Sequence, residues 1–106
     1  MYYVYVLKSQ LDNKLYIGYS ANLKKRFKEH QNGKVKSTKP RRPFELIFYE
    51  AYKSKVDAKR REKYFKTDKG KTTIKTMLRD SLMIQIIQPV TLFTDRHIRD
   101  SIFLEN

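Results

Sequence analysis

Two short runs of aromatic and β-branched residues, joined by a polar turn, constrain this fold most. The first run extends from Tyr2 to Leu7 and the second from Leu15 to Tyr19, with Asp12-Asn13-Lys14 between them. Such runs are typical of β-strands, and short polar turns join neighbouring antiparallel strands. We therefore expect the chain to begin with two adjacent antiparallel strands.

Successive side chains of a strand point to opposite faces, so the first strand predicts which residues pack together. Tyr5 and Leu7 share one face, and Val4 and Val6 share the other. Because both sets are apolar, we expect packing elements on both faces of the sheet. Gly18, near the end of the second strand, is expected to let the chain turn sharply into the next element.

A basic helix is predicted to begin after Ser20 or Asn22 and to run to about Gln31. Ser20 or Asn22 is suited to cap its N-terminus, and an Asn-Gly pair follows its last turn. Arg26 and His30 are four residues apart and therefore lie on one side of the helix, at the border of its apolar stripe.

Downstream, the sequence predicts a basic loop from Gly33 to Pro43, a strand from Leu46 to Tyr52 and a helix from Ser54 to about Lys66. After a break at 68–70, an apolar stripe with helical spacing predicts a third helix; its members are Ile74, Met77, Leu78 and Leu82. We expect an α+β domain over residues 1–80, with a three-stranded antiparallel-type sheet flanked by helices. Residues 81–106 form a C-terminal tail of unassigned structure.

Positive charge is concentrated in the predicted domain. The chain has a net charge of +13; residues 1–80 hold 22 basic and 8 acidic side chains, and residues 81–106 have a net charge of −1. DNA or structured nucleic acid is the natural partner of such a surface, although a solubilising surface is the simpler alternative. The predicted nucleic-acid contacts are Lys24, Lys25, Lys28, Lys34, Lys36, Lys39, Arg41 and Arg42.

Composition excludes several kinds of site. The chain has no cysteine, which excludes disulfides, thiolate zinc sites and cysteine nucleophiles. No stretch approaches the roughly 20 apolar residues of a membrane span, and the N-terminus lacks a signal-peptide pattern. We therefore expect a soluble, cytoplasmic protein without a membrane partner.

Glu62 is the acidic residue whose position is hardest to explain without a function. It recurs with Ala58 and Phe65 at i, i+4 and i+7, which predicts that it lies on the inward side of the second helix. A half-buried carboxylate needs a partner. The simplest partner is an ion pair with Lys66 or Lys59, which stabilises a helix only slightly.

The two strands, the basic helix and this glutamate together resemble the GIY-YIG nuclease family. Tyr3-Val4-Tyr5 stands where the family has a Gly-Ile-Tyr-like tripeptide and keeps its tyrosine, and Tyr16-Ile17-Gly18 is identical to the second tripeptide. Arg26 and Glu62 match the arginine and glutamate of the family's helices. The resemblance covers residues 2 to about 80, but an asparagine common in the family's third-helix region has no match.

The resemblance implies a divalent-metal-dependent endonuclease that hydrolyses phosphodiester bonds in DNA, including branched or damaged DNA. Tyr5 or Tyr16, or a water bound to one of them, would deprotonate the nucleophile. A free phenol has a pKa of about 10, so this role requires nearby cations. Arg26 would stabilise charge on the phosphate, and His30 would relay a proton or hydrogen-bond to the phosphate. Glu62 would bind Mg²⁺ or Mn²⁺.

Two other functions fit the sequence. The first is a non-catalytic nucleic-acid-binding module in which Tyr3 and Tyr5 stack bases on an exposed sheet face. The second is a basic protein that docks on an acidic partner protein.

For a nuclease of this size, we expect the tail, a partner protein or a second subunit to supply the substrate specificity.

Overall fold

A three-stranded antiparallel sheet is the centre of the structure, a computed structural model that describes residues 1–87. The strand order is β2-β1-β3, so β1 is central and both other strands are edges. The strands are β1 (Tyr2–Ser9), β2 (Leu15–Ser20) and β3 (Phe44–Tyr52). The predicted α+β class and the antiparallel sheet are confirmed. Residues 88–106, most of the predicted tail, lie outside the described residues.

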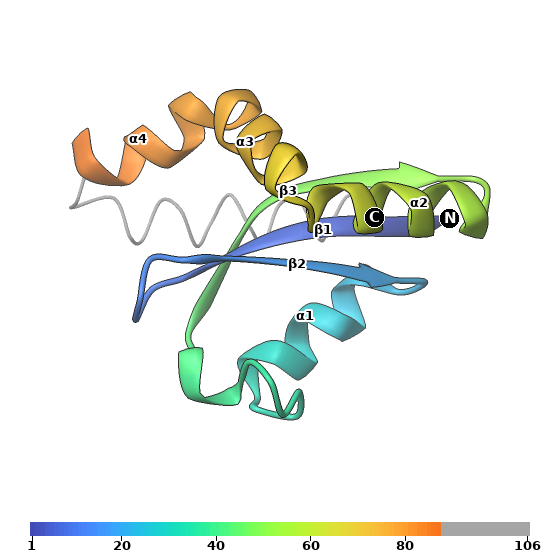
Figure 1. Cartoon of the computed structure of the whole chain (residues 1–106). Coiled ribbons are helices and arrows are strands. Elements are labelled where there is room, and N and C mark those ends of the chain that lie inside the picture. Colours follow the sequence, from blue (N-terminus) through green and yellow to red (C-terminus); the bar gives the residue numbers. More distant parts are fainter. Residues whose placement is uncertain (88–106) are drawn as a thin grey trace.

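Helices cover both faces of this sheet (Figure 1). Helix α1 (Leu23–Gln31) covers one face, and α2 (Lys55–Phe65) and α3 (Asp68–Met77) cover the other. A 3₁₀ turn, η1 (Lys39–Arg41), precedes β3, and α4 (Arg79–Ile87) follows α3. In the described part of the chain no helix has the length and apolar character needed to cross a membrane.

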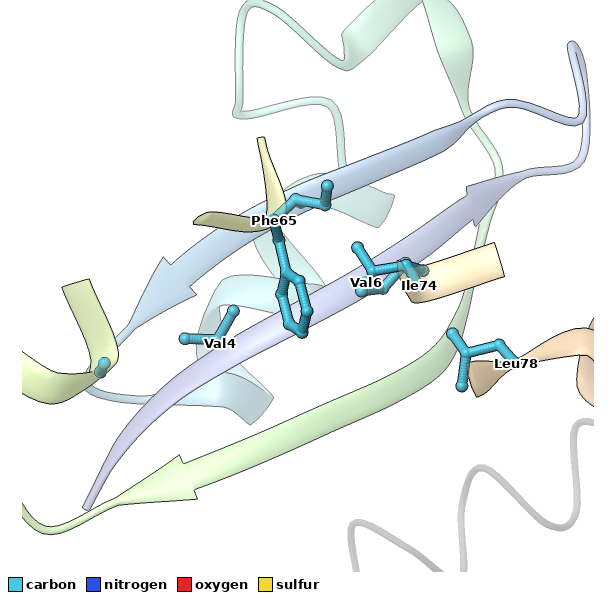
Figure 2. Close-up of a cluster of buried hydrophobic side chains, with 7 residues drawn as sticks. Val4, Val6, Phe65, Ile74 and Leu78 are labelled. Carbon is cyan, nitrogen blue, oxygen red and sulfur yellow. The ribbon is translucent and has the colours of Figure 1, made fainter. Parts of the chain in front are cut away.

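The two faces of β1 contribute to two separate cores. Val4 and Val6 pack with Phe65, Ile74 and Leu78 under α2 and α3 (Figure 2). The opposite core, under α1, contains Tyr5, Leu7, Leu23, Phe44 and Leu46. The predicted alternation is therefore confirmed. Because Tyr5 is only 1% exposed, the expectation that it stacks bases on an open sheet face is wrong.

Side-chain caps set the starts of the first two helices: of the two candidates for α1 the cap is Asn22, not Ser20, and Ser54 caps α2 as predicted. The Asn22 side chain accepts a hydrogen bond from the backbone N–H of Lys25, and Ser54 accepts one from the backbone N–H of Asp57. Gly33 follows α1 with a φ of 74°, the left-handed conformation that often terminates helices. Helix α1 is thus held at both ends, which fixes the position of its inward-facing residues.

Two glycines have roles that differ from the sequence expectations. Gly18 lies inside β2 opposite Tyr5, and a Cβ there would overlap the Tyr5 phenol. It makes room for that ring and does not turn the chain. The break predicted at 68–70 is wrong, because α3 begins at Asp68; Gly70 lies inside α3, where a Cβ would overlap the Tyr64 carbonyl, so it allows α2 and α3 to approach closely. The single third helix that was expected is divided into α3 and α4, which leaves Met77 exposed.

Candidate active site

Four of the predicted site residues lie together beneath α1. The Tyr5 hydroxyl is 2.8 Å from His30 Nε2, and the Arg26 guanidinium is close enough to lower the pKa of that hydroxyl. The Tyr16 ring centroid lies 5.1 Å from the His30 ring and 6.4 Å from the Tyr5 ring. Pairing of β1 with β2 brings the two tyrosines to one face, and packing of α1 on that face adds the arginine and the histidine.

The four residues differ in their access to solvent. Tyr5 and His30 are 1% and 0% exposed, whereas the Arg26 side chain is 38% exposed and Tyr16 is half-buried. Among the residues that the structure describes, the Tyr16 hydroxyl has no hydrogen-bond partner. Tyr16 and Arg26 are therefore the members that a ligand can reach directly.

Burial controls the protonation of the two enclosed groups. It raises the pKa of Tyr5 to about 12, against a smaller lowering by the neighbouring Arg26 guanidinium, so this phenol is neutral at physiological pH. Burial, together with the positive charge of Arg26, lowers the pKa of His30 to about 4. The imidazole is therefore uncharged at neutral pH.

Thr38 is a member of this cluster that the sequence analysis missed. Its hydroxyl lies 2.8 Å from His30 Nδ1, and the residue is fully buried. The sequence places it in the basic loop, where a threonine between lysines predicts only solvent exposure. No local pattern reveals the contact, because it forms only when the loop folds back against α1.

Glu62 lies on α2, which packs on the sheet face opposite α1. Its side chain is 16% exposed, and its carboxylate forms ion pairs with Lys66 at 3.1 Å and Lys59 at 3.8 Å. Both ion pairs considered from the sequence are present. The carboxylate is nevertheless close enough to contribute to the raised pKa of Tyr5. Lys59 lies 4.2 Å from the ring centroid of Tyr19, which places this turn of α2 near edge strand β2.

The described residues offer only a sparse set of metal ligands. No group of three or more His, Asp or Glu side chains among residues 1–87 is arranged to hold an ion. A single carboxylate suits Mg²⁺, which keeps several waters and completes its shell with substrate phosphate oxygens. Glu62 is a single half-buried carboxylate of this kind, and an ion bound to it would replace the ammonium groups of Lys66 and Lys59.

The predicted nucleic-acid contacts divide into two groups. A groove of about 400 Å³ runs along α1 and is lined by Lys24, Lys25, Lys28 and Lys34; Lys36 and Lys39 are exposed nearby in sequence. Arg41 instead pairs with Asp12 at 2.8 Å, and Arg42 donates to the carbonyl oxygens of Lys39 and Gln31. The two arginines are therefore engaged within the protein, which leaves the lysines as the more available cations.

His30 should make the protein less stable in mild acid. Its pKa is lowered from 6.5 to about 4 in the folded protein, so the unfolded chain binds more protons between these values. The free energy of unfolding should fall as the pH decreases from 6.5 to 4, by about 3 kcal/mol in total. Urea unfolding of wild type and His30→Gln over this range checks the effect. The variant should show a flatter dependence on pH, and parallel curves would contradict the assignment.

This chain is similar to a protein-family model, to several bacterial proteins and to a solved structure. Residues 1–75 match the family model described as "GIY-YIG catalytic domain". UPF0213 protein YazA of Bacillus subtilis is 48% identical over 66 residues, 61% of this chain and 66% of YazA, so the match spans about two thirds of that relative. UPF0213 protein SH2523 of Staphylococcus haemolyticus is 46% identical over 67 residues, 62% of this chain and 80% of the relative. The solution NMR structure of UPF0213 protein BH0048 from Bacillus halodurans has 34% identity and a TM-score of 0.47, covering 73% of this chain and 85% of that one.

Proposed function

The chain belongs to the GIY-YIG nuclease family, and from this premise we propose that it is a metal-dependent endonuclease that hydrolyses phosphodiester bonds in DNA. The observation that carries the proposal is the convergence of both motif tyrosines with Arg26 and His30 on one face of the sheet. A lysine-lined groove runs along the same helix. We propose residues 1–80 as the nuclease domain, with substrate specificity added by the tail, a partner protein or a second subunit.

We assign removal of the proton from the attacking water to Tyr16. Tyr5 is sealed from solvent, and its pKa of about 12 leaves its hydroxyl protonated and hydrogen-bonded within the protein. Tyr16 is half-buried, and among the described residues its hydroxyl is unengaged. A catalytic base must be within hydrogen-bond reach of the proton that it removes, and this condition favours Tyr16.

Arg26 is the proposed phosphate ligand. Its guanidinium pairs with Glu29 at 3.1 Å, lies close enough to Tyr5 for each group to shift the pKa of the other, and remains partly exposed. A planar, permanently charged group with five donors can hold these contacts and still bind a phosphate oxygen. His30 is fully buried, which argues against a direct phosphate contact and for a role in holding Tyr5.

Glu62 is the proposed ligand of Mg²⁺ or Mn²⁺, with water and substrate phosphate as the other ligands. When bound, the ion would supply positive charge that stabilises the transition state and the departing oxygen. The exposed lysines of α1 and of the following loop would bind the DNA backbone. Such contacts position the DNA but do not read its sequence.

Neutralising two lysines of the α1 groove should weaken DNA binding regardless of sequence. In the Lys28→Gln, Lys34→Gln double variant, the slope of log affinity against log salt should decrease by about 1 for each lysine that no longer binds a phosphate. Fluorescence anisotropy with a labelled duplex at several salt concentrations measures this slope. The matched control is Lys71→Gln, Lys75→Gln, which removes equal charge from α3 on the opposite face. Equal weakening by both double variants would indicate diffuse attraction and no specific groove.

A cleavage panel tests the proposed function. The full chain is incubated with supercoiled plasmid, linear duplex, flap, junction and single-stranded DNA, in Mg²⁺, Mn²⁺ or chelator. We expect nicks or breaks that require the metal and that disappear in a Tyr16→Phe preparation purified identically. Binding without cleavage under every divalent metal would favour the non-catalytic binding module. Weak binding with little salt dependence would favour the acidic protein partner.

A further inference from the structure

A chain of hydrogen bonds runs into the protein interior from Tyr5, which lies beside the candidate phosphate ligand Arg26. The Tyr5 hydroxyl, whose pKa the neighbouring Arg26 guanidinium lowers, lies 2.8 Å from His30 Nε2. His30 Nδ1 lies 2.8 Å from Thr38 Oγ1, which donates to the Val35 carbonyl at 3.4 Å. The three central residues are at most 1% exposed, so solvent does not compete for these bonds.

The two ends of this chain determine the direction of every bond in it. A guanidinium only donates and a carbonyl oxygen only accepts. The Arg26 guanidinium beside Tyr5 offers no acceptor, so the Tyr5 proton is directed to His30 Nε2 at 2.8 Å. Thr38 donates to Val35, so its oxygen accepts the Nδ1 proton of His30. Both ends therefore require the same neutral imidazole, with its proton on Nδ1.

We propose that Thr38 is a positioning residue for the cleavage reaction, because it holds His30 in the Nδ1–H tautomer and thereby fixes Tyr5 and Arg26. The proposal rests on the proposed function, in which Arg26 binds the scissile phosphate. Without the Thr38 hydroxyl, the Nδ1 proton has no acceptor in a site closed to water, which favours the Nε2–H tautomer. That tautomer donates to the Tyr5 oxygen and leaves the Tyr5 proton without an acceptor, which displaces the phenol beside Arg26.

The tautomer can be measured without DNA or metal. Long-range ¹H–¹⁵N spectra of the full chain distinguish the two tautomers, and the imidazole signals that persist in His97→Gln belong to His30. We expect Nδ1–H in the wild type and in Thr38→Ser, which keeps the hydroxyl. Thr38→Val, of similar shape, should shift the ring toward Nε2–H; Thr38→Ala serves if the valine variant does not fold. An Nε2–H wild type, or an unchanged tautomer in folded Thr38→Val, would overturn the proposal.

Arg26 provides a second readout that is independent of cleavage. Its side-chain Nε–H signal should move in Thr38→Val and remain in place in Thr38→Ser. A signal that stays unchanged in both variants would show that the chain does not reach the guanidinium. These spectra decide the role of Thr38 even if the wild type cleaves no substrate, a result that would defeat only the proposed function.

Kinetics then connect the chain to catalysis. Thr38→Val should lower kcat about 10-fold, the order of effect expected when a catalytic group is slightly misplaced, and leave KM within about twofold. Thr38→Ser should recover most of this decrease. In a Tyr5→Phe background the chain is already interrupted, so Thr38→Val should cause no further decrease. Additive effects in the double variant, or an effect confined to KM, would contradict a positioning role.

Discussion

Tyr16→Phe is expected to reduce the rate of DNA cleavage by about 10²- to 10⁴-fold, the usual contribution of an acid–base group, and to leave DNA affinity unchanged. Phenylalanine keeps the ring that lies 5.1 Å from the His30 ring and 6.4 Å from the Tyr5 ring, and removes only the hydroxyl. Single-turnover cleavage with enzyme in excess measures the chemical step. Anisotropy with the same DNA in chelator measures binding separately.

Tyr5→Phe is the matched control, since it removes the same group from the neighbouring strand. The Tyr5 hydroxyl is buried against His30 Nε2, so its removal leaves a buried nitrogen unpaired and should cost about 1–3 kcal/mol of unfolding free energy. Tyr16→Phe should change stability by less than about 0.5 kcal/mol. Cleavage by Tyr5→Phe should fall only about 10-fold, through misplacement of Arg26. If Tyr5→Phe abolished cleavage and Tyr16→Phe did not, the base would be Tyr5.

Glu62→Gln is expected to remove most of the metal-dependent activity, by about 10²-fold or more, because a bound ion contributes several kcal/mol of charge stabilisation. Glutamine has nearly the same shape and retains one oxygen but lacks the negative charge that attracts a divalent ion. Titration of cleavage with Mg²⁺ should show a shift to higher concentrations. Electron paramagnetic resonance of Mn²⁺ should show weaker binding in the presence of DNA.

Asp57→Asn is the control for removal of a negative charge from α2. The Asp57 carboxylate is 55% exposed and pairs with Arg60 at 3.1 Å, an interaction that contributes little to stability at the surface. This variant should retain wild-type cleavage and wild-type metal dependence. A Glu62→Gln variant with an unchanged metal titration would return Glu62 to a purely structural ion pair with Lys66 and Lys59.

Much of the fold could be predicted because the signals that specify it are local. The alternation of Val4 and Tyr5 placed them on opposite faces, Ser54 marked the start of α2, and Asn22 was one of two candidates for the start of α1. The role of Gly18 was not predictable in this way. Glycine near the end of a strand is compatible with a turn, and only the register that pairs it with Tyr5 shows that it makes room for a ring.

The sequence by itself determined the strands, the helices and the residue types that can meet beneath α1. The reason is that apolar side chains repeat every two residues in a strand and about every 3.6 residues in a helix, and neighbouring positions in the sequence show these repeats. Only the tertiary structure decided how each of these side chains behaves. Tyr5 and His30 are enclosed and neutral, Tyr16 remains accessible, and Thr38 anchors the hydrogen-bond chain. The physical reason is that burial and hydrogen-bond direction depend on all the elements around a group, and here the loop after α1 closes the site.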